Sequence, residues 1–146
     1  MTGLKFVVLE KRSALVVSGS DAEMFLQNLI SNDVKKVNRQ RAIYAALLTP
    51  QGKFLHDFFI SAHPEITGAY IIETEADRIG DLEKRLTMYR LRADVTLEPA
   101  PSDWGTLVAF GDAVAKVLKL ELVEGTAVSR ACGVVYVDPR LARLGV

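Results

Sequence analysis

The chain has 146 residues and a mass of 16.0 kDa, enough for one compact domain with a hydrophobic core. Hydrophobic residues make up 49% and charged residues 25%, and the 18 basic and 18 acidic side chains give a formal net charge of zero. That balance argues against a nucleic-acid partner bound through a basic surface. The single cysteine, Cys132, excludes an internal disulfide framework, and no apolar run approaches the roughly 18 residues that cross a membrane. We therefore expect a reducing, cytoplasmic setting and no membrane partner.

Short β-rich runs alternate with amphipathic stretches in the first third of the chain. Residues 5–9 and 14–18 flank a polar turn, which predicts a hairpin. Ser20, with Glu23 three positions later, predicts the capped start of a helix. The apolar face of that helix recurs at helical spacing through Ala22, Phe25, Leu26, Leu29 and Ile30.

The middle of the chain predicts a hairpin, a further strand and a second helix. Strands are expected at 42–48 and 54–61, because Pro50 and Gly52 between them favour a tight turn. A strand at 69–74 follows, and Thr74 is expected to cap the next helix. The expected core face of that helix is Ile79, Leu82, Leu86 and Tyr89.

The order of elements then partly recurs. Residues 15–19 lead into a helix near Asp21, and residues 106–111 lead into a helix near Asp112, each as strand, glycine, acidic residue and helix. The second of these helices is expected to bury Val114, Val117 and Leu118. The recurrence predicts an α+β fold of mostly antiparallel sheets with packed helices, built from duplicated β-β-α-β-β-β-α units. We expect residues 1–98 to form the first unit and residues 99–146 an incomplete second unit.

Asp57 is the most informative polar residue. Strand alternation places it on one face with Leu55 and Phe59, while the adjacent His56 points to the other face. A carboxylate among apolar side chains is desolvated, which suits it to bind a polar ligand atom or to act as an acid or base. The alternative is an aspartate at the sheet rim whose oxygens accept backbone N–H groups. Tyr44 lies on the preceding strand, so both side chains can share one sheet.

The remaining polar residues favour structural roles. His63 is expected to be structural or solvated in its loop, and two histidines and one cysteine leave few soft ligands, so no metal site is expected. A basic set ends the second helix, where it either complements the helix dipole or recognises the anionic tail of a ligand: Lys84, Arg85, Arg90 and Arg92.

Two segments together resemble a known family. Phe25-Leu-Gln-Asn-Leu-Ile-Ser-Asn-Asp-Val34 and Ala42-Ile-Tyr-Ala-Ala-Leu-Leu-Thr-Pro-Gln-Gly-Lys53 are similar to the folate-binding domain of two groups. One group is the T-protein of the glycine cleavage system, an aminomethyltransferase (GcvT). The other is the YgfZ-type proteins of iron–sulfur cluster assembly and repair, which residues 86–95 and 138–145 resemble more closely. The resemblance implies a duplicated α+β domain around a tetrahydrofolate site.

The resemblance also implies a set of ligand-contacting residues. In the T-protein, the second of two adjacent aspartates contacts folate and supports catalysis, and Asp57 stands at that position with His56 in place of the first. A folate-lining tyrosine corresponds to Tyr44, and an asparagine at the end of the next strand corresponds to Glu73, a departure. The implied cofactor-binding residues are therefore Tyr44, Asp57 and Glu73, with Asp57 catalytic only if the protein is a transferase.

These implications lead to one expected function and one alternative. The expected function is that of a tetrahydrofolate-binding accessory protein of the YgfZ type, with iron–sulfur client or assembly proteins as partners. The alternative is an aminomethyltransferase that transfers a one-carbon unit to tetrahydrofolate. The Lys-Gly-Cys-x-x-Gly-Gln-Glu motif of YgfZ-type proteins does not occur in this sequence. We therefore expect the N-terminal portion of a longer protein, not catalytic by itself, that exposes apolar surface and self-associates.

Overall fold

A computed structural model describes residues 3–130 and 133–146, so that Cys132 falls outside the described ranges. The helices and strands, including two short 3-10 helices labelled η, follow in chain order: β1 (Lys5–Val8), β2 (Arg12–Ser18), α1 (Ala22–Gln27), η1 (Val34–Lys36), β3 (Ile43–Leu48), β4 (Phe54–Ala62), β5 (Tyr70–Glu75), α2 (Ile79–Arg90), β6 (Thr96–Pro99), β7 (Leu107–Phe110), α3 (Val114–Leu118), β8 (Ala127–Arg130), β9 (Gly133–Tyr136) and η2 (Ala142–Leu144).

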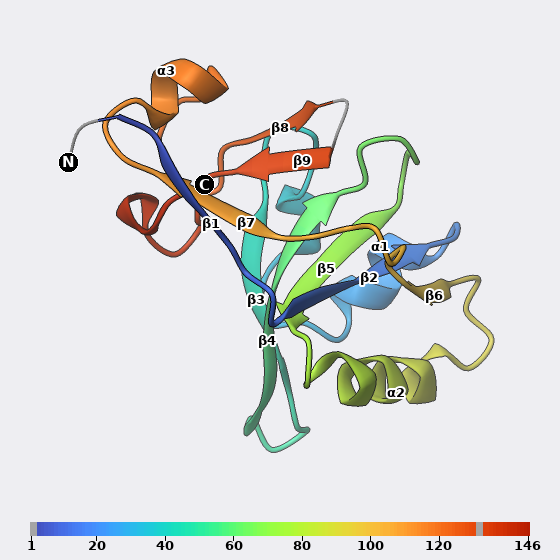
Figure 1. The fold of residues 1–146 in the computed structure, drawn as a ribbon. Helices are drawn as coiled ribbons and strands as arrows, with labels where there is room; N and C mark the ends of the chain where they lie inside the picture. The colour runs from blue at the N-terminus through green and yellow to red at the C-terminus, as the bar shows by residue number, and fades with distance from the viewer. Residues whose placement is uncertain (1–2, 131–132) are drawn as a thin grey trace.

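The predicted α+β fold with antiparallel sheets is confirmed. Five strands form a central sheet in the order β3-β4-β5-β2-β6, and each neighbouring pair is antiparallel. Two further antiparallel ribbons pair β1 with β7 and β8 with β9. In Figure 1 the β8–β9 hairpin and α2 lie at opposite ends of the picture, with the central sheet between them.

One face of the central sheet carries the hydrophobic core, because side chains alternate along each strand. On β4 the inward residues Phe58 and Ile60 are 1% and 0% exposed. Helices α1 and α2 supply residues to the same core: Ala22, Phe25, Leu26, Leu82 and Leu86. The opposite face of β4 is left to Asp57 and Phe59, both partly buried.

The predicted helix faces are only partly right. Leu82 and Leu86 of α2 are fully buried, whereas Tyr89 is 45% exposed in the last turn. In α3, Val114 is 2% exposed but Val117 is 54% exposed, because a five-residue helix has little more than one turn to pack. Within residues 3–130 and 133–146, no helix is both long and apolar enough to span a membrane.

The predicted hairpin between residues 5–9 and 14–18 is wrong. β1 pairs with β7, and the backbone N–H of Leu9 donates to the carbonyl of Thr106 at 2.8 Å. β2 instead lies between β5 and β6 in the central sheet. The polar segment before β2 therefore carries the chain from one sheet to another, and local turn chemistry cannot distinguish this from a hairpin.

Both predicted helix caps are also wrong, because each side chain forms a long-range bond instead. The Ser20 hydroxyl donates to the carboxylate of Asp94 at 2.6 Å, and Asp21 occupies the N-cap of α1 without a side-chain bond. Thr74 belongs to β5, where its hydroxyl donates to the backbone carbonyl of Asp57 at 2.8 Å. Tertiary contacts therefore override the local capping preference.

The predicted recurrence of strand, glycine and helix has a matching geometry. Gly19 follows β2 with φ +113°, and Gly111 follows β7 with φ +112°. A Cβ on Gly19 would lie 2.2 Å from the carbonyl oxygen of Asp94, and one on Gly111 would lie 2.3 Å from that of Gly3. Each glycine thus permits the same close backbone approach, before β6 in one case and before β1 in the other.

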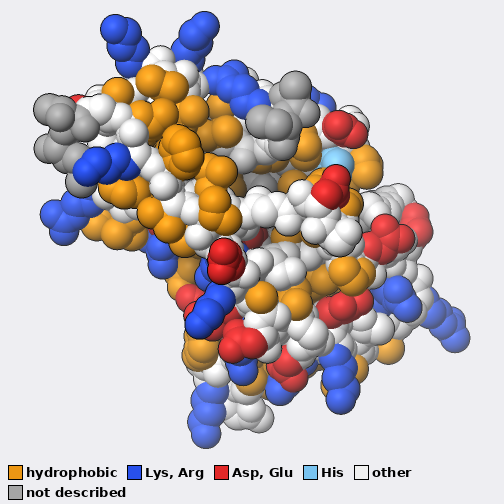
Figure 2. Space-filling view, viewed as in Figure 1, with side chains coloured by type: hydrophobic (Ala, Val, Ile, Leu, Met, Phe, Trp, Pro, Cys, Tyr) orange, Lys and Arg blue, Asp and Glu red, His pale blue; other side chains and the backbone are white. Residues whose placement is uncertain are grey.

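The β1–β7 ribbon exposes several apolar side chains. Phe6, Val8 and Leu107 are 63%, 61% and 55% exposed. The register pairs Val8 with Leu107, so these side chains project to the same side of the ribbon. Figure 2 shows hydrophobic side chains gathered over the region where β1, β7 and α3 lie. Exposed apolar strands of this kind favour association with a second surface.

Candidate functional site

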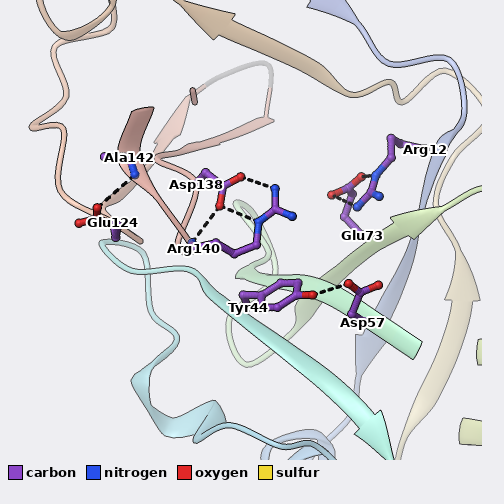
Figure 3. Close-up of polar contacts among 8 residues, drawn as sticks. All are labelled: Arg12, Tyr44, Asp57, Glu73, Glu124, Asp138, Arg140 and Ala142. Carbon is purple, nitrogen blue, oxygen red and sulfur yellow. Dashed lines mark hydrogen bonds and ion pairs between the residues drawn. The ribbon is translucent and has the colours of Figure 1, made fainter. Parts of the chain in front are cut away.

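The β3–β4 hairpin brings two of the predicted residues into direct contact. Tyr44 lies opposite Phe59, and Ala46 lies opposite Asp57, so the tyrosine is the diagonal neighbour of the aspartate. The Tyr44 phenol donates a hydrogen bond to Oδ2 of Asp57 (Figure 3). This bond raises the pKa of Tyr44, and partial burial acts in the same direction. The side chain of Asp57 is thus bonded by a phenol rather than by the backbone donors of the alternative interpretation.

A cation from the C-terminal segment covers this pair. The guanidinium carbon of Arg140 lies 5.5 Å from the ring centre of Tyr44 and 4.9 Å from that of Phe59. These distances are typical of cation–π contacts. The two rings are themselves 5.5 Å apart, and the ring of Tyr136 on β9 lies 6.0 Å from Phe59. Burial raises the pKa of Tyr136. The Tyr44–Asp57 pair therefore lies in a row of three aromatic rings, with the Arg140 guanidinium over two of them.

Asp138 holds Arg140 in this position. Its Oδ2 accepts from Nη2 of Arg140 at 2.6 Å, and its Oδ1 accepts from Nε at 3.0 Å and from the Arg140 backbone N–H at 2.9 Å. Burial opposes ionisation of this carboxyl, but the bonds from Arg140 are strong enough to hold the pKa of Asp138 below its usual value. The arrangement is a bidentate pair, the geometry in which arginine binds carboxylates most strongly.

The third predicted residue, Glu73, has a different partner. It lies opposite Phe59 across the β4–β5 pair and is 8% exposed. Both of its oxygens accept from Arg12 of β2, and the Nη2–Oε2 distance is 3.1 Å (Figure 3). The guanidinium of Arg12 also lies 5.7 Å from the ring centre of Phe59. The structure therefore places Glu73 on the same face as Tyr44 and Asp57, with its charge balanced by Arg12.

A small cavity adjoins this region at the end of the sheet. It has a volume of about 140 Å³ and is lined by Phe54, His56, Asp57, Thr74, Glu75 and Arg78. Ligand pockets for drug-sized molecules usually span roughly 300–1,000 Å³. The cavity shares Asp57 with the site described above, but Tyr44, Phe59 and Glu73 are not among its lining residues, and its volume is too small for a molecule as large as a folate.

The two histidines have structural partners. His56 is 2% exposed, and its Nε2 lies 2.6 Å from Oδ2 of Asp81 on α2. Arg85 and, to a smaller extent, His56 lower the pKa of Asp81 to about 2. His63 is 8% exposed, and its Nδ1 accepts two backbone N–H groups of its own loop at 3.1 and 3.0 Å. His56 therefore ties β4 to α2, on the face away from Asp57, and His63 stabilises a loop.

The basic set on and after α2 does not join the site. Helix α2 packs against the core face of the sheet, opposite the face of Tyr44 and Asp57. Arg85 in this set donates to Asp81 at 2.7 Å. Across residues 3–130 and 133–146, no group of three or more His, Cys, Asp or Glu side chains is placed to hold a metal ion.

Four residues around the Tyr44–Asp57 pair come from distant parts of the chain and were not predicted as site residues. Asp138 and Arg140 were noted only as part of a segment that resembles the family, and Arg12 and Tyr136 were not singled out. The only local signal was the Asp-Pro-Arg order, which favours a turn in which aspartate bonds the residue two positions later.

These features define the class of the protein: an α+β domain of antiparallel sheets, with helices on one face and a polar, aromatic site on the other. The chain belongs to the family described as the GCVT N-terminal domain, whose model matches residues 9–133. The predicted kinship with the T-protein and YgfZ-type group is thereby confirmed.

Particular relatives refine this assignment. The mitochondrial iron–sulfur cluster assembly factor IBA57 is 33% identical over 150 residues in Mus musculus and 31% identical over 150 residues in Homo sapiens. Each alignment covers 94% of this chain and 40% of the relative, so the chain spans about two fifths of their length. The crystal structure of the glycine cleavage system aminomethyltransferase T from Bartonella henselae matches with a TM-score of 0.71. That match covers 88% of this chain and 36% of the other at 15% identity, which shows a shared fold.

The predicted cytoplasmic setting is contradicted by this comparison. The curated relatives from mouse, human and Neurospora crassa are named as mitochondrial proteins. The expectation rested on a single cysteine and on the absence of long apolar runs. Those features describe a reducing compartment in general, so composition could not separate the cytoplasm from mitochondria.

Proposed function

We propose that this chain supplies a tetrahydrofolate-binding face to a protein that assists iron–sulfur cluster assembly. The iron–sulfur role follows from the relatives, which are named as cluster assembly factors. The folate ligand follows from the family resemblance. The observation that carries the proposal is the Tyr44–Asp57 pair, in which a carboxylate is oriented by a phenol beside stacked aromatic rings.

In this proposal each residue has a distinct task. Asp57 accepts a hydrogen bond from a ligand N–H through its Oδ1, the oxygen that Tyr44 does not use. Tyr44 orients the carboxylate and offers part of its ring to a flat ligand. Glu73 offers a polar contact on the same face of the sheet, where Arg12 neutralises its charge. In a transferase, Asp57 would be the catalytic residue.

The size of the cavity at Asp57 limits what this site binds alone. The cavity of about 140 Å³ that Asp57 lines is too small for a whole folate, and Tyr44 and Glu73 lie outside its lining. The proposal therefore includes a division of labour, in which residues 1–98 form the first unit, residues 99–146 contribute part of a second, and further chain completes the pocket. Affinity of the chain itself is expected to be weak, and affinity of a longer homologous protein to be higher.

Calorimetric titration with 5-formyltetrahydrofolate tests the ligand. We expect binding that weakens about tenfold or more in Asp57→Asn, because a hydrogen bond to a charged group contributes about 1.5–3 kcal/mol. The matched control is Asp103→Asn, which removes the same charge from an exposed loop. Equal affinity of Asp57→Asn and wild type would remove Asp57 from the site.

A second experiment tests the cellular role. In cells depleted of the homologous assembly factor, a full-length homologue in which this sequence replaces the matching segment should restore the activity of iron–sulfur enzymes, while the activity of enzymes without iron–sulfur clusters should remain unchanged. Asp57→Asn should restore less activity. Aminomethyl transfer above background in a reconstituted glycine cleavage assay would instead support the transferase alternative.

A further inference from the structure

Arg140 lies between two carboxylates, and only one of them holds it. Asp138 accepts two guanidinium N–H bonds and the backbone N–H of Arg140. Asp57 lies close enough for its charge to stabilise the Arg140 cation. No bond joins the two in the described part of the chain, because Oδ2 of Asp57 is bonded to Tyr44 and the guanidinium is turned toward Asp138.

Release of Arg140 would change the site. Its side chain is 45% exposed and can therefore change rotamer, whereas the Asp138 side chain is only 14% exposed. The backbone N–H of Asp138 donates to the carbonyl of Gly145 at 2.9 Å, which fixes the segment that carries it. Without the Asp138 charge, the strongest acceptor near the guanidinium is the carboxylate of Asp57. An Arg140–Asp57 pair would then occupy the oxygen that a ligand needs.

We propose that Asp138 is a positioning residue that keeps Arg140 on the rings of Tyr44 and Phe59 and thereby leaves Asp57 open to a ligand. The carboxylates of Asp138 and Asp57 compete for the Arg140 guanidinium, and the fixed carboxylate of Asp138 binds it more strongly. The part of this inference that concerns ligand affinity rests on the proposed folate-binding function. The part that concerns the Tyr44–Asp57 pair does not, because it can be measured without ligand.

Two variants separate positioning from simple stabilisation. Asp138→Asn removes the charge but keeps a side-chain oxygen for the Arg140 backbone N–H, so the turn is retained. We expect affinity for 5-formyltetrahydrofolate to fall about tenfold as Arg140 moves onto Asp57. The double variant Asp138→Asn/Arg140→Gln removes the competing cation and should recover most of the affinity. A purely structural defect would not recover.

A matched control comes from the same segment. Glu124 also caps it, because its Oε1 accepts the backbone N–H of Ala142 at 3.1 Å, but Figure 3 shows it away from Tyr44 and Asp57. Glu124→Gln should therefore bind 5-formyltetrahydrofolate as the wild type does. If Asp138→Asn does not fold by circular dichroism, Asp138→Ser repeats the charge removal with a hydroxyl in place of the amide.

The ligand-free measurement is the ionisation of Tyr44. The sequence has four tyrosines, so the Tyr44 signal is the difference between ultraviolet titrations of each variant with and without Tyr44→Phe. The groups facing Tyr44 are Asp57, Asp138 and Arg140. When Arg140 pairs with Asp57, the guanidinium offsets the negative charge that favours the protonated phenol. The pKa of Tyr44 should therefore fall by about one unit. In the double variant it should return to the wild-type value or above.

The outcomes distinguish the two proposals. The expected shift of Tyr44 without folate binding by any variant would retain the positioning role of Asp138 and overturn the proposed ligand. Folate binding that Asp138→Asn leaves unchanged, with an unshifted Tyr44, would overturn the positioning role alone. Loss of affinity that the double variant fails to recover would also overturn it, because the defect would then be structural.

Discussion

Substitution of Gly125 by alanine should detach the segment that covers the candidate site. Gly125 precedes β8 with φ +81°, and its carbonyl accepts the backbone N–H of Ala42, the residue before β3, at 2.7 Å. Its own N–H donates to the carbonyl of Val137 at 3.1 Å, one residue before Asp138. The glycine thus ties the β8–β9 hairpin and the following turn to the strand of the site tyrosine.

The expected magnitude has two parts. A left-handed backbone at a non-glycine residue costs about 1–2 kcal/mol. A Cβ at Gly125 would in addition lie 2.7 Å from the Ala42 carbonyl oxygen, so the backbone must move and the hydrogen bond of the Ala42 N–H would break. An unsatisfied buried N–H costs about 1–3 kcal/mol. Gly68 has the same φ of +81°, but a Cβ added there would meet nothing within 4 Å, so Gly68→Ala carries only the first part.

Urea unfolding followed by circular dichroism measures the difference. Because small proteins lose about 1–3 kcal/mol of stability per molar urea, Gly125→Ala should unfold at a midpoint about 1 M below Gly68→Ala. Superimposable unfolding curves for the two variants would refute the reasoning, since only the steric contact and its hydrogen bond distinguish them.

Three other perturbations have outcomes that the same structure determines. The pKa of Asp81 is lowered to about 2 from 3.8, so its contribution to stability is present above pH 3.8 and is lost as the pH falls toward 2. The free energy of unfolding should therefore decrease less steeply with falling pH in Asp81→Asn than in the wild type, and equal slopes would contradict this. Gly19→Ala and Gly111→Ala should each destabilise more than Gly68→Ala in thermal melts, because a Cβ would meet backbone oxygen at 2.2 and 2.3 Å. Phe6→Ser/Val8→Ser should reduce self-association in light scattering, because both side chains are more than 60% exposed on one ribbon face; a monomeric wild type at high concentration would disprove it.

Sequence alone could predict what depends on alternation and short hairpins. The β3–β4 hairpin, the opposite faces of His56 and Asp57 and the shared sheet of Tyr44 and Asp57 all follow from residues within about twenty positions. Long-range partners could not be predicted in this way. The cation above the rings, Arg140, lies more than eighty residues from both, and no local pattern specifies which turn will cover which strand.

The helix starts were misjudged for a related physical reason. A serine or threonine hydroxyl near a helix can bond a helix N–H or any other acceptor in reach. Ser20 and Thr74 bond Asp94 and a strand carbonyl instead, because the folded sheet brings those acceptors within 2.6 and 2.8 Å. Capping preferences therefore name the residues at an element boundary more reliably than they name the bonds those residues make.

A bulge in the β3–β4 hairpin decides which side chains meet at the candidate site. Next to the turn, Leu48 pairs with Phe54, but Leu47 pairs with His56. The ladder thus accommodates one additional residue, Leu55, on β4. Turn chemistry and strand propensity do not reveal such an insertion, because both flanking runs look continuous in sequence.

The additional residue has a direct consequence for function. An unbulged hairpin closed by the same turn would set Tyr44 opposite Phe58, and residues directly opposite each other project from the same face. The tyrosine would then enter the core, with Asp57 on the other side of the sheet. In the observed register Tyr44 lies opposite Phe59 and diagonal to Asp57, within reach of its carboxylate. The one-residue shift that buries Phe58 therefore also brings the phenol to the carboxylate, so core packing and site geometry select the same register.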